Sequence, residues 1–179
     1  MRPGGRLRLA AAASIAGILS GLLAGVLGRI DMRLVAVIRG DAPGFSITGT
    51  IGILLVFLIM GCTLALLFAL LAVGRAGPAW WSLIGVALFA GVLLLTPLRQ
   101  ELGGRPTFIA LFVPVGLLLG WASAWLTLLI SRSLPERTGP GRLVYGLLAA
   151  PSLVAAIALP LLLVLGILQV IGVVPIADQ

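Results

Sequence analysis

The strongest constraint on this chain is the separation between its charges and its apolar residues. Five long apolar runs fill most of the sequence, and the 12 basic residues, all of them arginine, lie outside these runs. A charged side chain at the centre of a bilayer costs about 2.5–3.5 kcal/mol on insertion scales. A soluble helix would instead carry charges along its solvent-facing side. The pattern therefore predicts an integral membrane protein that crosses the bilayer several times.

Composition and net charge support this class of protein. Hydrophobic residues make up 61% of the 179 residues and charged residues 9%, against about 25% charged residues in soluble domains. The formal charge of +7 comes from arginines that flank the apolar runs, where they are positioned to contact lipid phosphates. We therefore expect membrane lipids as partners, and no nucleic acid.

The apolar runs are long enough to cross a membrane as helices. A bilayer core about 30 Å thick requires about 20 residues, and the runs cover residues 9–27, 47–73, 80–98, 108–130 and 143–174. We predict an all-α bundle of about five transmembrane helices in a single domain over residues 1–179. The last run contains Pro151 and Pro160, which kink a helix. It is interpreted as one long bent span, with a re-entrant hairpin as the alternative.

The arginines also predict an orientation in the cell membrane. Arg2, Arg6 and Arg8 precede the first apolar run, and a basic N-terminus before the first span favours the cytoplasmic side. We therefore predict a multi-pass protein with its N-terminus in the cytoplasm and its C-terminus outside. No convincing small-residue cleavage site closes the first run, so it is interpreted as an uncleaved helix, with a cleaved signal peptide as the alternative.

Small residues recur at helical spacing in the first and fourth runs: Ala13, Gly17, Gly21 and Gly25, then Gly116, Gly120, Ser123, Thr127 and Ser131. Each set falls on one face of a helix, and small side chains let transmembrane helices approach closely. Two interpretations follow. The small residues pack the helices of this chain against one another, or those of the first helix bind a partner or a second copy.

Five aromatic residues are expected on one side of the membrane: Trp80, Trp81, Trp121, Trp125 and Tyr145. Tryptophan and tyrosine concentrate at the level of the lipid headgroups, so this distribution is typical of interfacial anchoring. A docking surface for a partner at Trp80 and Trp81 is the alternative.

Charged residues gather in the first and third connections between the runs. From residue 29 to 39 the sequence largely alternates between apolar and other residues, which is typical of an extended strand. We expect this stretch to lie along the outer membrane surface. The two connections hold the candidate residues for binding a ligand or a lipid headgroup: Arg29, Asp31, Arg33, Arg39, Asp41, Arg99, Glu101 and Arg105. The alternative interpretation of these residues is a structural ion network with lipid contacts.

The sequence offers little chemistry for catalysis. It has no histidine and a single cysteine, Cys62, which excludes most zinc and thiol mechanisms. We therefore predict no catalytic residue, no metal site and no cofactor. Gln169 lies near the end of the last run, and its amide is expected to face another helix or the outer surface.

Three functional hypotheses follow, from different classes. The first is a non-catalytic accessory or scaffold subunit that acts through helix–helix contacts, with other membrane subunits or a second copy as partner. The second is a transport component that binds a small anionic or zwitterionic solute, or a lipid headgroup, at the outer charges. The third is a lipid-modifying enzyme that uses Asp31, Asp41 or Glu101 as a general base.

Overall fold

The protein folds into a bundle of helices. The computed structural model describes residues 3–40, 46–72, 78–95, 112–135 and 141–170. Over these residues every regular element is helical: α1 (Pro3–Arg39), α2 (Ile47–Leu67), the π-helical turn η1 (Phe68–Ala72), α3 (Pro78–Leu95), α6 (Val113–Ser133) and α7 (Gly141–Val170). The predicted all-α membrane bundle is confirmed.

Four of the described helices are long and apolar enough to cross a membrane. These segments are Gly5–Arg39, Ile47–Leu71, Val113–Ser133 and Leu143–Leu165. The remaining helix, α3, is apolar but has only 18 residues, or about 27 Å at 1.5 Å per residue. The chain is therefore a multi-pass membrane protein.

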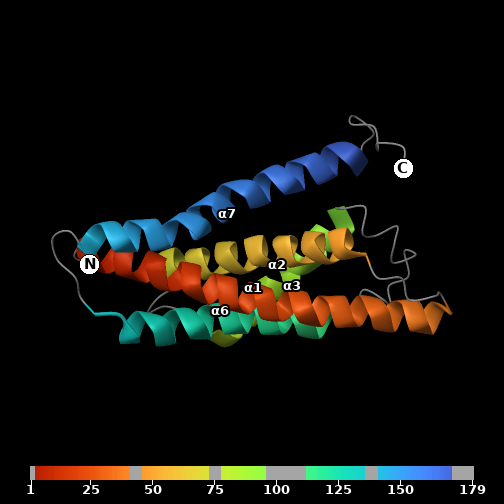
Figure 1. Cartoon of the computed structure of the whole chain (residues 1–179), viewed down its shortest axis with the longest axis horizontal. Coiled ribbons are helices and arrows are strands. Elements are labelled where there is room, and N and C mark those ends of the chain that lie inside the picture. The colour runs from red at the N-terminus through yellow and green to blue at the C-terminus, as the bar shows by residue number, and fades with distance from the viewer. Residues whose placement is uncertain (1–2, 41–45, 73–77, 96–111, 136–140, 171–179) are drawn as a thin grey trace.

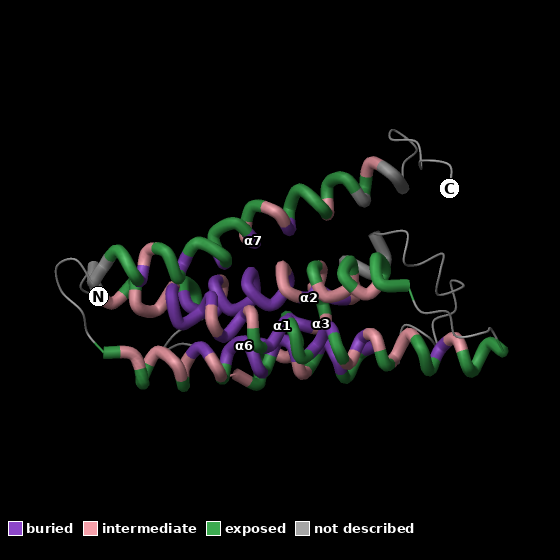
Figure 2. The backbone as a smooth tube through the Cα atoms, viewed as in Figure 1, coloured by how far each residue is buried: buried purple, intermediate pink, exposed green. Residues whose placement is uncertain are grey.

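Helix α1 lies at the centre of the bundle. It contacts α2, α6 and α7, whereas α3 packs mainly against α6 (Figure 1). The larger hydrophobic cluster draws buried side chains from all five α-helices, among them Val35, Phe57, Phe89, Leu119 and Leu159. Buried positions accordingly concentrate along the middle of the bundle (Figure 2).

The extended strand predicted after Arg29 is wrong, because α1 continues as a helix to Arg39. No glycine or proline interrupts this stretch. Val35 is buried in the core, and Met32 packs against it, so the inward positions recur at helical rather than strand spacing. The helix ends at Gly40, whose φ of +75° is the left-handed conformation that commonly terminates helices. Its N–H donates to the Val37 carbonyl at 3.0 Å.

The length of α1 has a consequence for its position in the membrane. Its 37 residues extend about 56 Å, whereas the hydrocarbon core is about 30 Å thick. At least one end of α1 must therefore project beyond the core or the helix must tilt strongly.

Helix α7 is a single continuous helix with Pro151 and Pro160 inside it. The re-entrant hairpin is therefore not the structure of residues 141–170. Prolines are tolerated inside transmembrane helices when neighbouring groups satisfy the freed backbone carbonyls. Figure 1 shows the later half of α7 leaving the bundle. None of the side chains described beyond Leu159 is buried.

The two ends of the described chain lie apart. Helix α1 begins at one end of the bundle, and α7 ends at the other (Figure 1). Which of these ends faces the cytoplasm stays a prediction from the arginines.

Candidate functional site

The glycines of α1 lie against the backbone of α2. A Cβ atom built on Gly21 would lie 2.7 Å from the Cα of Leu58 and 2.7 Å from the carbonyl oxygen of Phe57. A Cβ atom on Gly61 would lie 2.9 Å from the backbone nitrogen of Gly21. Gly17 faces the backbone of Cys62 and Gly61 in the same way. Within this chain, α2 covers the face of α1 that carries these glycines.

The glycines of α6 lie against α3. A Cβ atom on Gly116 would lie 3.0 Å from the Cα of Val86, and one on Gly120 would meet the carbonyl of Trp81. The contact is reciprocal, because a Cβ atom on Gly85 of α3 would lie 2.7 Å from the Cα of Gly120. Two helix pairs, α1 with α2 and α3 with α6, therefore approach at backbone distance.

Trp81 lies inside the bundle rather than on a docking surface. It is 4% exposed, and its ring packs edge-on against Phe68 with centroids 5.5 Å apart. Its indole N–H has no hydrogen-bond partner in the described part of the chain. Trp80 is exposed, and Trp121 and Trp125 stack on each other at the surface of α6 with centroids 5.5 Å apart. The alternative of a docking surface at Trp80 and Trp81 therefore does not hold for Trp81, and for Trp80 it stays a prediction.

Buried hydroxyl groups connect α1 to two other helices. Ser14 donates a hydrogen bond to Ser152 of α7 at 2.9 Å, and Ser20 pairs with Ser123 of α6 at 2.8 Å. The Thr127 hydroxyl instead donates to the Ser123 carbonyl one turn earlier. Such interhelical bonds contribute about 0.6–2 kcal/mol each in a membrane. The spacing of Ser123 and Thr127 in the sequence indicated that they lie on a packing face. Ser14 and Ser152 belong to no such pattern, so the sequence did not predict their hydrogen bond.

Four of the candidate residues of the outer charge cluster lie in the described part of the chain, on the last three turns of α1: Arg29, Asp31, Arg33 and Arg39. Arg29 and Arg33 are four residues apart and share a face of the helix. Arg33 and Arg39 are exposed, whereas Arg29 and Asp31 are half-buried. The other four residues of the predicted cluster lie outside the described residues: Asp41, Arg99, Glu101 and Arg105. Their meeting with α1 stays a prediction.

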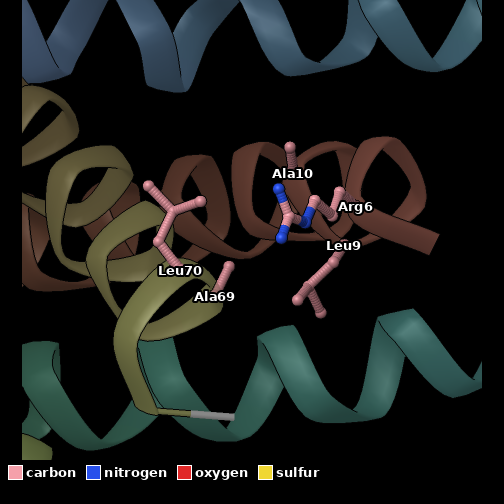
Figure 3. A pocket seen from close by; sticks show the side chains of 5 residues that line it. All are labelled: Arg6, Leu9, Ala10, Ala69 and Leu70. Carbon is pink, nitrogen blue, oxygen red and sulfur yellow. The ribbon is translucent and has the colours of Figure 1, made fainter. Parts of the chain in front are cut away.

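A cavity that the sequence did not indicate lies at the end of the bundle where α1 begins. It has a volume of about 280 Å³ and is lined by Arg6, Leu9 and Ala10 of α1 and by Ala69 and Leu70 of η1. Figure 3 shows the Arg6 side chain extending along the space between α1 and η1, with α7 and α6 on either side. The cavity joins one permanent positive charge to apolar walls, an arrangement suited to an amphipathic anion.

The described residues hold no group of three or more His, Cys, Asp or Glu side chains that could bind a metal ion. Cys62 is buried, next to the Ser152 hydroxyl. No protein-family model, no curated protein and no solved structure matches this chain.

Proposed function

We propose that the protein is a non-catalytic accessory or scaffold subunit of a complex in the cell membrane, and that it acts through helix–helix contacts. Its partner is a helix of another membrane subunit or of a second copy. The close approach of small residues holds its own helices together, as in other membrane bundles. The observation that carries the proposal is the later half of α7.

The two halves of α7 differ in how they are covered. The part of α7 up to Leu159 buries Ser152, Ala155 and Leu159 at spacings of three and four, which is one face of a helix. Beyond Leu159 the helix continues without a buried side chain among those described. Only 22% of the apolar window of α7 is buried, against 56% for α1 and for α2. Leu163 still packs against the core cluster, but the exposed side chains of this part of α7 offer a surface to another helix.

The sequence near the end of α7 is compatible with a protein partner. It includes Gln169, whose side chain lies outside the described part of the structure. Its amide facing another helix stays a prediction, with the outer surface as the alternative.

Bulky substitutions on this surface test the proposal. Leu161 and Leu165 are 58% and 50% exposed and lie one turn apart, so Leu161→Trp with Leu165→Trp adds volume on one face. Overpacking of a well-packed contact costs about 1–3 kcal/mol. Taken as a loss of binding free energy, this lowers the affinity about five- to 150-fold. We expect the double variant, extracted in a mild detergent and purified through a tag, to retain correspondingly less partner protein than the wild type.

A matched control exists on α1. Leu19 and Leu23 are each 50% exposed and are also one turn apart, so Leu19→Trp with Leu23→Trp makes the same chemical change on a different surface. This variant should retain the partner as the wild type does. Equal partner retention by the wild type and both double variants would remove α7 as the contact surface.

A transport component is the second candidate, and the end of α1 is the observation that favours it. Arg29 and Arg33 lie four residues apart on one face of the helix, which provides two positive charges for a small anionic solute. For this function the purified chain should carry a small molecule and no partner protein.

A further inference from the structure

The cavity at the start of α1 combines a guanidinium group with apolar walls. Arg6 and Leu9 lie on adjacent turns of α1, and Ala69 and Leu70 lie across from them on η1. Leu9 also packs against a cluster of buried alanines from α1, α2 and η1. Figure 3 shows the nitrogen atoms of Arg6 reaching toward η1 rather than away from the bundle. The charge therefore lies over the mouth of an apolar space.

The local backbone explains why this space stays open. Helix α2 changes to a π-helical turn at Phe68, where the N–H of Phe68 is shared between the carbonyls of Leu64 and Ala65. π-helical turns are rare and occur frequently at functional sites, and η1 follows directly on the end of α2. The small side chains of Ala10 and Ala69 then leave the space between α1 and η1 unfilled.

The charge of Arg6 is available to a ligand. An arginine side chain stays protonated at any physiological pH, and Arg6 is exposed and lines the cavity. The planar guanidinium group matches phosphate oxygens with two parallel hydrogen bonds. A phosphate group is therefore the chemistry that fits the polar side of the cavity.

We propose that this cavity binds an anionic phospholipid, with Arg6 holding the phosphate and Leu9, Ala69 and Leu70 contacting the first part of an acyl chain. The volume of about 280 Å³ lies just below the usual range of ligand pockets, about 300–1,000 Å³. It accommodates a headgroup and the start of one chain, with the rest of the lipid remaining in the bilayer.

Two observations favour a lipid over a free phosphate ion. Four of the five lining side chains are aliphatic, and a free ion would leave them uncovered. The cavity also lies at an end of the apolar helices, where the surrounding bilayer presents headgroups. Basic pockets between transmembrane helices bind anionic headgroups in other membrane proteins. The proposal does not depend on the scaffold function or on α7.

Arg6→Ala and Arg132→Ala form a matched pair of variants for the test. Arg132 is exposed in the last turn of α6, at the same end of the bundle (Figure 1), and does not line the cavity. The full chain in a mild non-ionic detergent is titrated with phosphatidylglycerol, and the bound lipid is counted by native mass spectrometry. We expect one tightly bound lipid on the wild type, and an affinity lower by about tenfold or more for Arg6→Ala. Arg132→Ala should bind within about twofold of the wild type, because Arg132 does not line the cavity.

A third variant tests the apolar wall. Ala10→Leu places extra volume in the cavity and keeps Arg6, so it should weaken phosphatidylglycerol binding as Arg6→Ala does. Phosphatidylcholine, whose choline group offsets the phosphate charge, should bind the wild type more weakly than phosphatidylglycerol. Inorganic phosphate should not displace the bound lipid at millimolar concentration.

Two results would overturn the proposal. Equal loss of lipid from Arg6→Ala and Arg132→Ala would mean that lipid responds to the overall charge of this face and not to the cavity. Displacement of phosphatidylglycerol by inorganic phosphate would assign the site to a free anion. Because Arg6 is exposed, its replacement leaves the packed core intact, and the comparison with Arg132→Ala decides the question even where Ala10→Leu lowers stability.

Discussion

We expect Gly21→Ala to destabilise the protein and Gly52→Ala to leave its stability unchanged or raise it. The new methyl group at position 21 would lie 2.7 Å from two backbone atoms of α2, the Cα of Leu58 and the carbonyl oxygen of Phe57. Backbone atoms cannot rotate away as side chains can, so α1 and α2 must separate. Overpacking of this kind costs about 1–3 kcal/mol.

The control at Gly52 makes the same chemical change in open space. No atom lies within 4 Å of a Cβ atom built there, and alanine in a helix interior is more stable than glycine by about 0.5–1 kcal/mol. The two substitutions are therefore expected to differ in sign. Similar unfolding midpoints for both variants would contradict the close approach of α1 and α2.

The lone cysteine provides the measurement. Cys62 is 1% exposed and is the single cysteine of the chain, so a thiol-reactive fluorophore labels it only as the bundle opens. Labelling during heating in a mild detergent gives the unfolding midpoint. A loss of 1 kcal/mol lowers the midpoint by about 2–4 °C in a protein of this size. Gly21→Ala should therefore lower it by several degrees or more.

The second large effect is expected within α3, where Gly85 and Gly91 make a pair on the same helix. A Cβ atom on Gly85 would lie 2.7 Å from the Cα and from the backbone nitrogen of Gly120, whereas one on Gly91 has no atom within 4 Å. Gly85→Ala should force α3 away from α6 and cost about 1–3 kcal/mol. Gly91→Ala should be neutral or stabilising.

Tryptophan emission suits the test of α3, since Trp81 is buried on this helix beside Phe68. Gly85→Ala should lower the unfolding midpoint followed by the emission maximum, and Gly91→Ala should not. Equal unfolding midpoints for Gly85→Ala and Gly91→Ala would contradict the close contact between Gly85 of α3 and Gly120 of α6. Because the two interfaces use different helices, the effects of Gly21→Ala and Gly85→Ala should nearly add.

Much of the fold was predictable because apolar length alone identifies membrane helices. The second predicted run begins at Ile47, as α2 does. The region from Arg29 to Arg39 was not predicted, because its charges suggested a connection, whereas the buried face through Met32 and Val35 continues the helix. Spacing also indicated a close-packing face at Gly17 and Gly21. It could not indicate that Gly61 of α2 lies opposite, because one helix's periodicity carries no information about its neighbour.

The candidate sites were less predictable, because the sequence of one segment does not show which distant segment packs against it. Four members of the outer charge cluster are near one another because they lie on one helix, which the sequence already placed together. The cavity at Arg6 instead depends on a π-helical turn at Phe68–Ala72 and on contact between segments about sixty residues apart. Neither glycine nor proline marks that turn in the sequence. The sequence pattern indicated a role for Arg6 only in orienting the first span.

The proposal that this chain works through contacts with another membrane helix is tested most directly by the mass of the intact particle. The wild-type protein is extracted from its own host in a mild detergent and measured by native mass spectrometry. A single chain has a mass of 18.4 kDa. We predict a particle that contains at least one further polypeptide, either a different subunit or a second copy. A particle with the mass of one chain, with or without bound lipid or a small molecule, would contradict the proposal.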